Sequence, residues 1–259
     1  MKKDILICLT QALIILGCSS GTVSSNEDGS SESDKIVLTR ADVQEEYIKD
    51  DRDGETYRIV KIGNQWWMAE NLRYAVDSSL CYNRENYFCE TYGRLYPWII
   101  AMNLDTIYYR KGAIYDDVID CYHQGVCPMN WHIPTKVEWE TMINFIQMHN
   151  GTEGDGTSLR SSQMWAEYKV GETMVTHSDR FGFSILPAGF HKGPVLNDDG
   201  YEEFTRRAFF WTATEVNSFR NDVAKSYYVM IDGYRNDNAA LLYGNKSKID
   251  ALSIRCIKN

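Results

Sequence analysis

The sequence is short of the features that mark several common protein classes. Its seven cysteines never stand as C-x-x-C, which argues against a zinc ribbon or a thioredoxin-like redox site. Its five histidines never recur at i and i+4, the spacing that places two metal ligands on one helix face. A glycine-rich phosphate loop is missing. Basic residues are outnumbered, 27 Lys and Arg against 36 Asp and Glu, and the net charge of -9 argues against nucleic acid and anionic head groups as partners.

The first residues have the pattern of an export signal. Lys2 and Lys3 precede an apolar run over residues 5–16, which is shorter than the ~20 residues that a membrane span needs. The run ends in "IILGC", which resembles the lipobox of bacterial lipoproteins. The resemblance implies that residues 1–17 are removed and that Cys18 carries lipid, which would anchor the chain to a membrane of the cell envelope, with the outer membrane expected. Ordinary secretion with a coincidental cysteine is the alternative.

A polar segment separates this signal from the rest of the chain. Residues 19–34, "SSGTVSSNEDGSSESD", are mainly Ser, Gly and acidic residues, which bury too little apolar surface to fold. We expect residues 18–49 to form a flexible tether and residues 50–259 to form a single domain.

Hydrophobic periodicity predicts strands before and after a central helix. Residues 56–62 alternate as a strand and turn at Gly63-Asn64 into a second one, while residues 92–104 predict a short helix. The apolar pattern of residues 134–151 is the clearest helix prediction in the sequence. Short alternating segments follow beyond residue 180, at 180–190, 208–215, 226–231 and 252–259. This order predicts an α+β fold with an antiparallel sheet and long loops.

The start of the central helix, residues 124–140, looks chemically active but is better explained as a structural corner. Thr135 is placed to be the N-cap, with Glu138 as its capping-box partner. Trp131 and Trp139 flank the helix start, where large aromatic side chains usually pack in the core. Cys127 and His132 have no further clustered ligands, whereas a structural zinc site needs four. The apolar face of the helix is predicted to comprise Val137, Met142, Ile143 and Ile146.

Five cysteines remain in the exported chain, so one is odd if the others pair in an oxidising compartment. Cys81 and Cys89 are close in sequence and predict a local disulfide. A Cys127–Cys256 disulfide would tie the last strand to the centre of the domain. Pairing of Cys121 with Cys127 is the alternative.

Six blocks of the sequence, in order, resemble the Fibrobacter succinogenes major paralogous domain, a family of secreted and lipoprotein modules. The blocks are "DGETYRIVKIGNQWWMAENLRY", "CYNRENYFCETYGRLYPW", "QGVCPMNWHIPTKVEW", "GFSILPAGF", "FFWTATE" and "SIRCIKN". The resemblance implies a fold similar to C-type lectins and to formylglycine-generating enzymes. Those enzymes use paired cysteines in the C-terminal part of the fold, where this chain has only Cys256, so their chemistry is not expected here.

The long loops and final strands of a lectin-like fold carry ligand contacts, and residues 211–245 offer the aromatic, amide and charged groups that bind sugars. The candidate ligand-binding residues are Trp211, Glu215, Tyr234, Arg235, Asn236, Asp237 and Asn238. The alternative is that "RNDN" is merely a turn, since Asn and Asp tolerate left-handed backbone. No cofactor is indicated; calcium is only weakly suggested, because the Glu-Pro-Asn or Gln-Pro-Asp tripeptide of calcium-dependent lectins is missing.

The sequence therefore predicts a non-catalytic binding module on a lipid anchor, with an extracellular polysaccharide or a surface protein as its partner. A structural or protein-binding display lipoprotein is the alternative. An enzyme is less favoured, because carboxylate pairs for glycoside hydrolysis could be chosen arbitrarily from any acidic chain.

Overall fold

A computed structural model describes residues 36–113, 116–194, 199–216, 225–236 and 240–259, and only the backbone of residues 241–245. Residues 36–259 form one compact unit. In the part of the chain described, no helix has both the length and the apolar character needed to cross a lipid bilayer.

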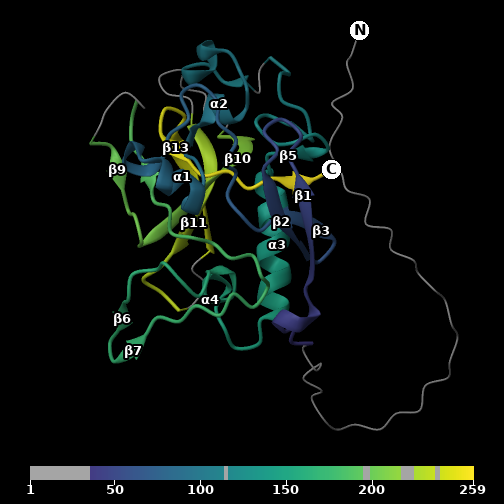
Figure 1. Cartoon of the computed structure of the whole chain (residues 1–259), viewed down its shortest axis with the longest axis vertical. Coiled ribbons are helices and arrows are strands. Elements are labelled where there is room, and N and C mark those ends of the chain that lie inside the picture. The colour runs from purple at the N-terminus through teal and green to yellow at the C-terminus, as the bar shows by residue number, and fades with distance from the viewer. Residues whose placement is uncertain (1–35, 114–115, 195–198, 217–224, 237–239) are drawn as a thin grey trace, which may run out of the picture. The chain divides into compact units, whose positions relative to one another are not determined.

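The strands of the described residues form four antiparallel sheets (Figure 1). The first sheet has the order β1-β2-β3-β14-β5, with β1 Gln44–Lys49, β2 Thr56–Ile62, β3 Gln65–Met68, β14 Ile257–Lys258 and β5 Trp131–His132. The second joins β10 Arg207–Glu215, β11 Lys225–Asp232 and β12 Ala240–Ser247. The third has the order β4-β13-β8-β9, with β4 Tyr96–Pro97, β13 Ala251–Leu252, β8 Phe190–His191 and β9 Tyr201–Glu202. A hairpin of β6 Lys169–Val170 and β7 Thr173–Met174 is the fourth.

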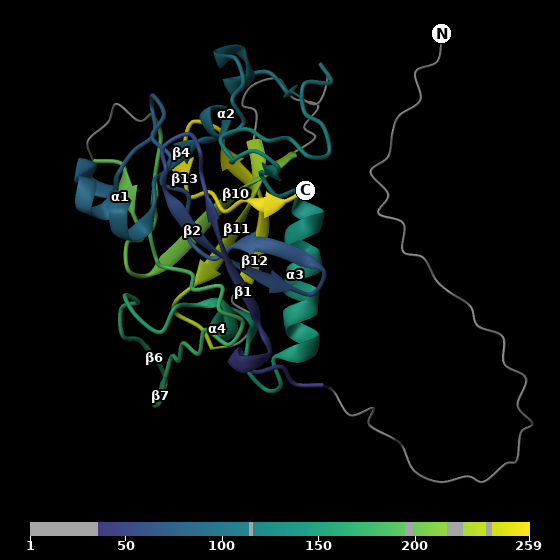
Figure 2. The same ribbon diagram turned by 45° about the vertical axis from the view of Figure 1, so that its right-hand side comes forward.

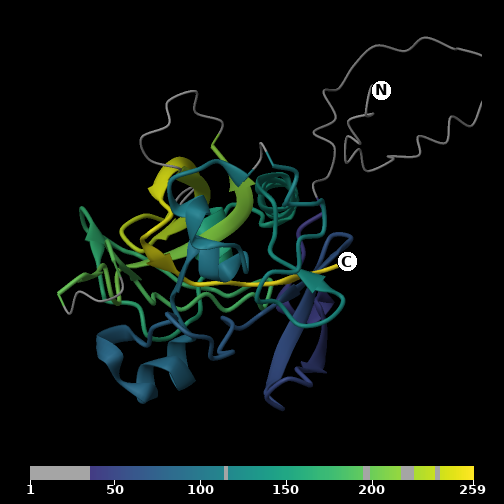
Figure 3. The ribbon, with the colours of Figure 1, turned by 90° about the horizontal axis from the view of Figure 1, so that it is seen from above.

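Helices occupy the spaces between and around these sheets. The α-helices of the described residues are α1 Asn86–Tyr92, α2 Trp98–Ala101, α3 Lys136–His149 and α4 Asp155–Leu159. Short 3-10 turns are η1 Arg40–Asp42, η2 Tyr82–Arg84 and η3 Thr106–Tyr109. The longest helix, α3, contacts β2 of the first sheet and all three strands of the second. Figure 3 shows α3 end-on beside both sheets, while α1 projects away from them. The predicted α+β class is confirmed.

The predicted capping box of α3 is confirmed, and it includes a buried histidine. The Glu138 backbone N–H donates to Thr135 Oγ1 (3.3 Å), and the Thr135 N–H donates to Glu138 Oε2 (2.7 Å). The other carboxylate oxygen, Oε1, lies 2.9 Å from Nε2 of His132, which is fully buried. His132, in β5, is therefore linked to the start of α3 through the same carboxylate that caps the helix.

The core is rich in aromatic side chains packed against α3 and between the sheets. Trp67 and Trp139 lie with their ring centroids 4.8 Å apart, and Phe183 packs edge-on against both. Trp131 and Trp139 are buried as predicted. Met142, Ile143 and Ile146 are buried as well, but Val137 is 65% exposed, so its predicted place on the apolar face is wrong. Val137 precedes Trp139 by two residues, so on a helix it points away from the face that carries Trp139 and Met142. Figure 2 shows α3 along its length.

Both predicted disulfides are confirmed, Cys81–Cys89 and Cys127–Cys256. Because Cys127 pairs with Cys256, the alternative Cys121–Cys127 bridge is wrong.

Two further predictions, the start of the domain and a strand at residues 180–190, are wrong. The compact unit includes residues 36–49, which were predicted to belong to the tether, because residues 44–49 pair with β2 as an edge strand. Residues 180–190 are irregular except at β8, because positive φ angles at Gly182, Ser184 and Gly189 interrupt an extended strand.

Candidate functional site

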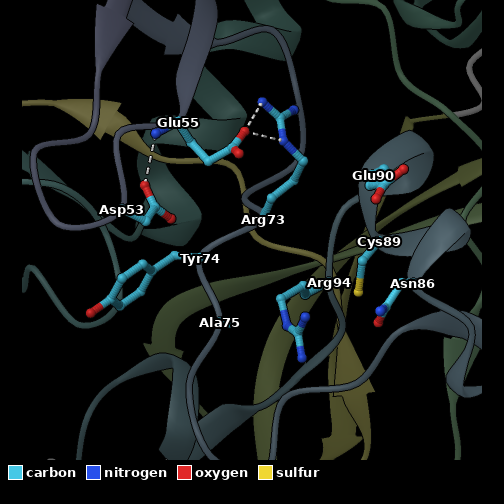
Figure 4. A pocket seen from close by; sticks show the side chains of 9 residues that line it. All are labelled: Asp53, Glu55, Arg73, Tyr74, Ala75, Asn86, Cys89, Glu90 and Arg94. Atoms are coloured by element: carbon cyan, nitrogen blue, oxygen red, sulfur yellow. Dashed lines mark hydrogen bonds and ion pairs between the residues drawn. The ribbon is translucent and has the colours of Figure 1, made fainter.

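A pocket of about 640 Å³ opens between the turn that precedes β2 and helix α1 (Figure 4). The residues that line it are Asp53, Glu55, Arg73, Tyr74, Ala75, Asn86, Cys89, Glu90 and Arg94. In Figure 4, Asp53, Glu55 and Tyr74 lie on one side of it and Asn86, Glu90 and Arg94 on the other. Charged, amide and aromatic groups thus face one cavity.

The first wall is a tight turn held by Asp50. Its backbone N–H and C=O bond to Glu55 O and Gly54 N, both at 2.8 Å, and its carboxylate accepts from Arg52 at 2.8 and 2.6 Å. Burial alone would raise the pKa of Asp50, but the hydrogen bonds and charge of Arg52 outweigh it and hold that pKa below its usual value. The Arg52 guanidinium also lies 3.8 Å from the Tyr74 ring centroid.

The second wall is α1, which two local features hold in place. The Cys81–Cys89 disulfide closes the segment from η2 into the helix. Gly93 ends the helix at φ 78°, and a Cβ there would lie 2.5 Å from the Cβ of Asn71. Only glycine allows α1 to end this close to the loop after β3.

Two arginines line the pocket, and their surroundings differ. Arg73 lies 3.0 Å from a carboxylate oxygen of Glu55 and 3.7 Å from one of Glu70, so its charge is compensated. Arg94 donates to Ser79 Oγ (2.8 Å), to Ser79 O (3.3 Å) and to Cys81 Sγ (3.7 Å), all neutral acceptors. Within the described residues, no carboxylate forms an ion pair with Arg94. Its guanidinium is fixed in position but not neutralised.

A smaller hollow of about 180 Å³ adjoins this pocket and shares Arg73 and Glu90 with it. Arg255, only 1% exposed, lies at this hollow and donates to Asn71 Oδ1 (2.8 Å) and Ser184 O (3.0 Å). Burial, with the nearby positive charge of Arg58, lowers the pKa of Arg255 to about 9. The pocket and the hollow together form a polar groove, which we call the α1 groove.

Two of the predicted ligand-binding residues are buried. Trp211 is 0% exposed and its indole N–H donates to Tyr96 O at 2.8 Å, so the ring belongs to the core. Glu215 is buried in an ion pair with Lys248. The prediction that these two side chains contact a ligand is therefore wrong, because neither reaches the surface.

The remaining predicted residues lie apart from the α1 groove. Tyr234 is half-buried, packs edge-on against Tyr168 at 4.6 Å, and lines a separate cavity of about 330 Å³. Arg235 is exposed. The Asn236 side chain accepts from Thr176 N (2.8 Å) and donates to Met174 O (3.0 Å), so it ties two loops together. Asp237 and Asn238 lie outside the described residues, and ligand binding there stays a prediction.

A buried arginine, Arg160, holds the loop that carries Tyr234 through hydrogen bonds to its backbone. Arg160 donates to Asp232 O (2.7 Å), to Arg235 O (2.9 Å) and, through Nε, to His177 Nδ1 (2.8 Å). Burial and the Arg160 charge lower the pKa of His177 to about 4, well below the ~6.5 of an unfolded chain.

This histidine predicts a loss of stability in acid. As pH falls below ~6.5 the unfolded chain binds a proton at His177, whereas the folded chain binds it only near pH 4, so the free energy of unfolding falls across that window. We expect a loss of ~1–2 kcal/mol between pH 7.5 and pH 5, measured by urea denaturation. The His177→Gln variant keeps a hydrogen-bond acceptor but does not titrate, so its loss should be smaller by that amount. Equal losses in both proteins would contradict this prediction.

Sequence reasoning missed the α1 groove. The residues of its main pocket come from three separate segments, 53–55, 73–75 and 86–94, and none of these segments carries a binding motif. The available signal was the pair Cys81 and Cys89, eight positions apart in sequence, which indicates a short segment closed by a local disulfide. Over the described residues, no group of three or more His, Cys, Asp or Glu side chains is placed to hold a metal ion.

Comparison with known proteins agrees with the sequence blocks. Residues 60–258 match the family described as the Fibrobacter succinogenes major domain. Neither the curated proteins nor the solved structures include a significant match to this chain. The match spans most of the chain, and this protein therefore belongs to the Fibrobacter succinogenes major domain family.

Proposed function

We propose that this protein is a cell-envelope lipoprotein whose compact domain, residues 36–259, binds a polysaccharide in the α1 groove without transforming it. Lipid on Cys18 would anchor the chain to the outer membrane. The Ser-rich segment would hold the domain away from the bilayer. The lectin-like fold predicted from the sequence is part of this proposal.

The observation that carries the proposal is the chemistry of the pocket of about 640 Å³. Its lining combines the Tyr74 ring with the amide of Asn86, the carboxylate of Glu90 and the guanidinium of Arg94. Glu90 is exposed, and in the part of the chain described it forms no ion pair. Sugar hydroxyls are bound by planar amide, carboxylate and guanidinium groups, and aromatic rings pack against sugar C–H surfaces. A binding role requires nothing beyond these groups.

The hollow beside the main pocket would extend the site for a ligand of several sugar units. The hollow at Arg255 continues the main pocket, and the two share Arg73 and Glu90 as a common wall. Both walls of the pocket are braced, by Asp50 with Arg52 on one side and by the Cys81–Cys89 disulfide on the other. A preformed groove lowers the entropic cost of binding.

The test is retention of the oxidised domain, residues 36–259, on insoluble cellulose and xylan, with calcium and with chelator. This segment contains the described core and both disulfides, so it can be produced by itself. Replacing Asn86 and Glu90 with alanine removes two ligand-facing polar groups and should weaken retention by ~10-fold or more. The matched control is Tyr168→Ala with Tyr234→Ala, which alters the separate cavity.

The outcomes distinguish the two candidate functions. Retention that only the Asn86 and Glu90 variant loses supports polysaccharide binding in the α1 groove. Loss in the tyrosine variant alone would move the site to the final loops, and loss with chelator would establish a calcium requirement. No retention on either polymer would contradict the polysaccharide proposal and favour a structural or protein-binding display lipoprotein.

A further inference from the structure

Arg94 is the unexplained charge of the α1 groove. Its Nε and Nη2 are held by the Ser79 hydroxyl and carbonyl, and its Nη1 lies 3.7 Å from Cys81 Sγ. Of the residues that the structure describes, none supplies it with a carboxylate partner. Half-buried arginines are ordinarily paired, because a cation removed from water needs a compensating charge or good hydrogen bonds.

The charge of the other arginine of the pocket, Arg73, is compensated by neighbouring carboxylates. Arg73 bonds to Glu55 through Nε (3.1 Å) and Nη2 (3.0 Å), and also donates to Thr56 O. Its guanidinium also lies over the Tyr57 ring, 4.6 Å from the centroid. Arg73 therefore braces the pocket wall and has little capacity left for a ligand, whereas Arg94 has only neutral contacts.

The position of Arg94 suits an anionic ligand group despite the carboxylates of the pocket. Asp53 and Glu55 lie across the cavity from it (Figure 4), and Glu55 is neutralised by Arg73. The guanidinium is fixed on one edge by Ser79, so a ligand carboxylate meeting its other N–H groups loses little side-chain entropy.

From this we infer that the ligand of the α1 groove carries a carboxylate, as in a uronic-acid-containing polysaccharide, and that Arg94 binds that carboxylate. This inference rests on the proposed function and specifies the class of polysaccharide. Neutral hydroxyls of the same sugar chain would be bound by Asn86 and Glu90.

The test compares two forms of one ligand on the isolated domain, residues 36–259. Binding of oligogalacturonate is measured by titration calorimetry beside its fully methyl-esterified form, which has the same rings without the charge. We expect the free acid to bind ~10- to 100-fold more tightly, the range for a charge-assisted hydrogen-bonded pair. Xylo-oligosaccharide serves as a neutral ligand for the proposed groove itself.

Variants of Arg94 assign the effect to this side chain. Arg94→Gln should remove the preference for the free acid and change affinity for xylo-oligosaccharide by less than ~3-fold. Arg94→Lys keeps the charge but loses the planar fork, so it should retain only part of the preference. Arg110→Gln, an exposed position in the turn after η3, makes the same change in net charge and should have no effect. Thermal unfolding of each variant checks that the domain remains folded.

The outcomes separate the two proposals. Equal binding of the free acid and the ester would overturn the inference about Arg94, while binding of either would leave the groove as a polysaccharide site. A preference for the acid that survives Arg94→Gln would also overturn it and place the anion elsewhere. If neither form nor xylo-oligosaccharide binds, the proposed function fails and the inference fails with it.

Discussion

Replacing Cys127 and Cys256 together with alanine is expected to lower the free energy of unfolding by ~5 kcal/mol. The disulfide joins positions 129 residues apart, so its loss frees a very long loop in the unfolded chain. In the chain-entropy model the stabilisation grows with the logarithm of loop length, which makes this bridge worth more than any local one. A loss of this size is comparable to the whole stability of many domains.

The location of this disulfide adds to the expected effect. Both cysteines are 0% exposed and lie in the hydrophobic core with Met68 and Trp131. The carbonyl of Cys256 accepts the Met68 N–H at 2.9 Å, next to the pairing of β14 with β3. The bridge thus holds the C-terminal strand in the middle of the first sheet, between β3 and β5.

The matched control is the other disulfide. Replacing Cys81 and Cys89, which are separated by eight residues, should cost only ~2–3 kcal/mol in the same model. Urea denaturation of the two double variants beside the oxidised parent measures both values. A loss for the Cys81 and Cys89 variant equal to or larger than that for the Cys127 and Cys256 variant would contradict the loop-length argument.

The Lys248→Met substitution should be nearly as damaging, lowering the free energy of unfolding by ~3–5 kcal/mol. Lys248 is 0% exposed and forms a buried ion pair with Glu215. Its ammonium also donates to Tyr108 O at 3.1 Å and lies 4.1 Å from the centroid of the Trp98 ring. Burial lowers the pKa of Lys248, and methionine would leave a buried carboxylate without its cation.

A double-mutant cycle separates the cost of losing the pair from the cost of stranding one partner. Glu215→Leu combined with Lys248→Met removes both charges, so the double variant should be more stable than the Lys248→Met variant. The measurement is the urea midpoint of the parent, both single variants and the double variant. Additive losses would contradict the view that the two side chains act as one buried unit.

The contrast between Trp211 and Arg94 shows why the candidate site could not be found from sequence. Trp211 is of a residue type that often binds sugars, yet it lies in β10 with its side chain buried and its indole N–H donating to Tyr96 O. Arg94 has no distinguishing sequence context, yet it lines the main pocket of the α1 groove. Residue type says what a side chain can bind, while access to solvent depends on contacts between segments far apart in the chain.

Local features of this protein were determined by its sequence. The Thr135–Glu138 capping box, the β2–β3 hairpin at Gly63 and the closely spaced Cys81–Cys89 bridge all depend on residues within a few positions of one another. The family, too, could be recognised from the order of the sequence blocks. These predictions held because short-range hydrogen bonding and backbone preference are encoded where they act.

The tertiary structure alone decided the features that join distant segments. It placed residues 44–49 in the first sheet, buried Trp211 and Glu215, and brought the segments around Tyr74 and Arg94 to one groove. An edge strand needs a partner, a buried charge needs its counter-ion, and a cavity needs two walls. Each of these depends on packing across the whole domain. A segment is buried only when another segment packs against it, so the free energy of burial cannot be assigned to one segment alone.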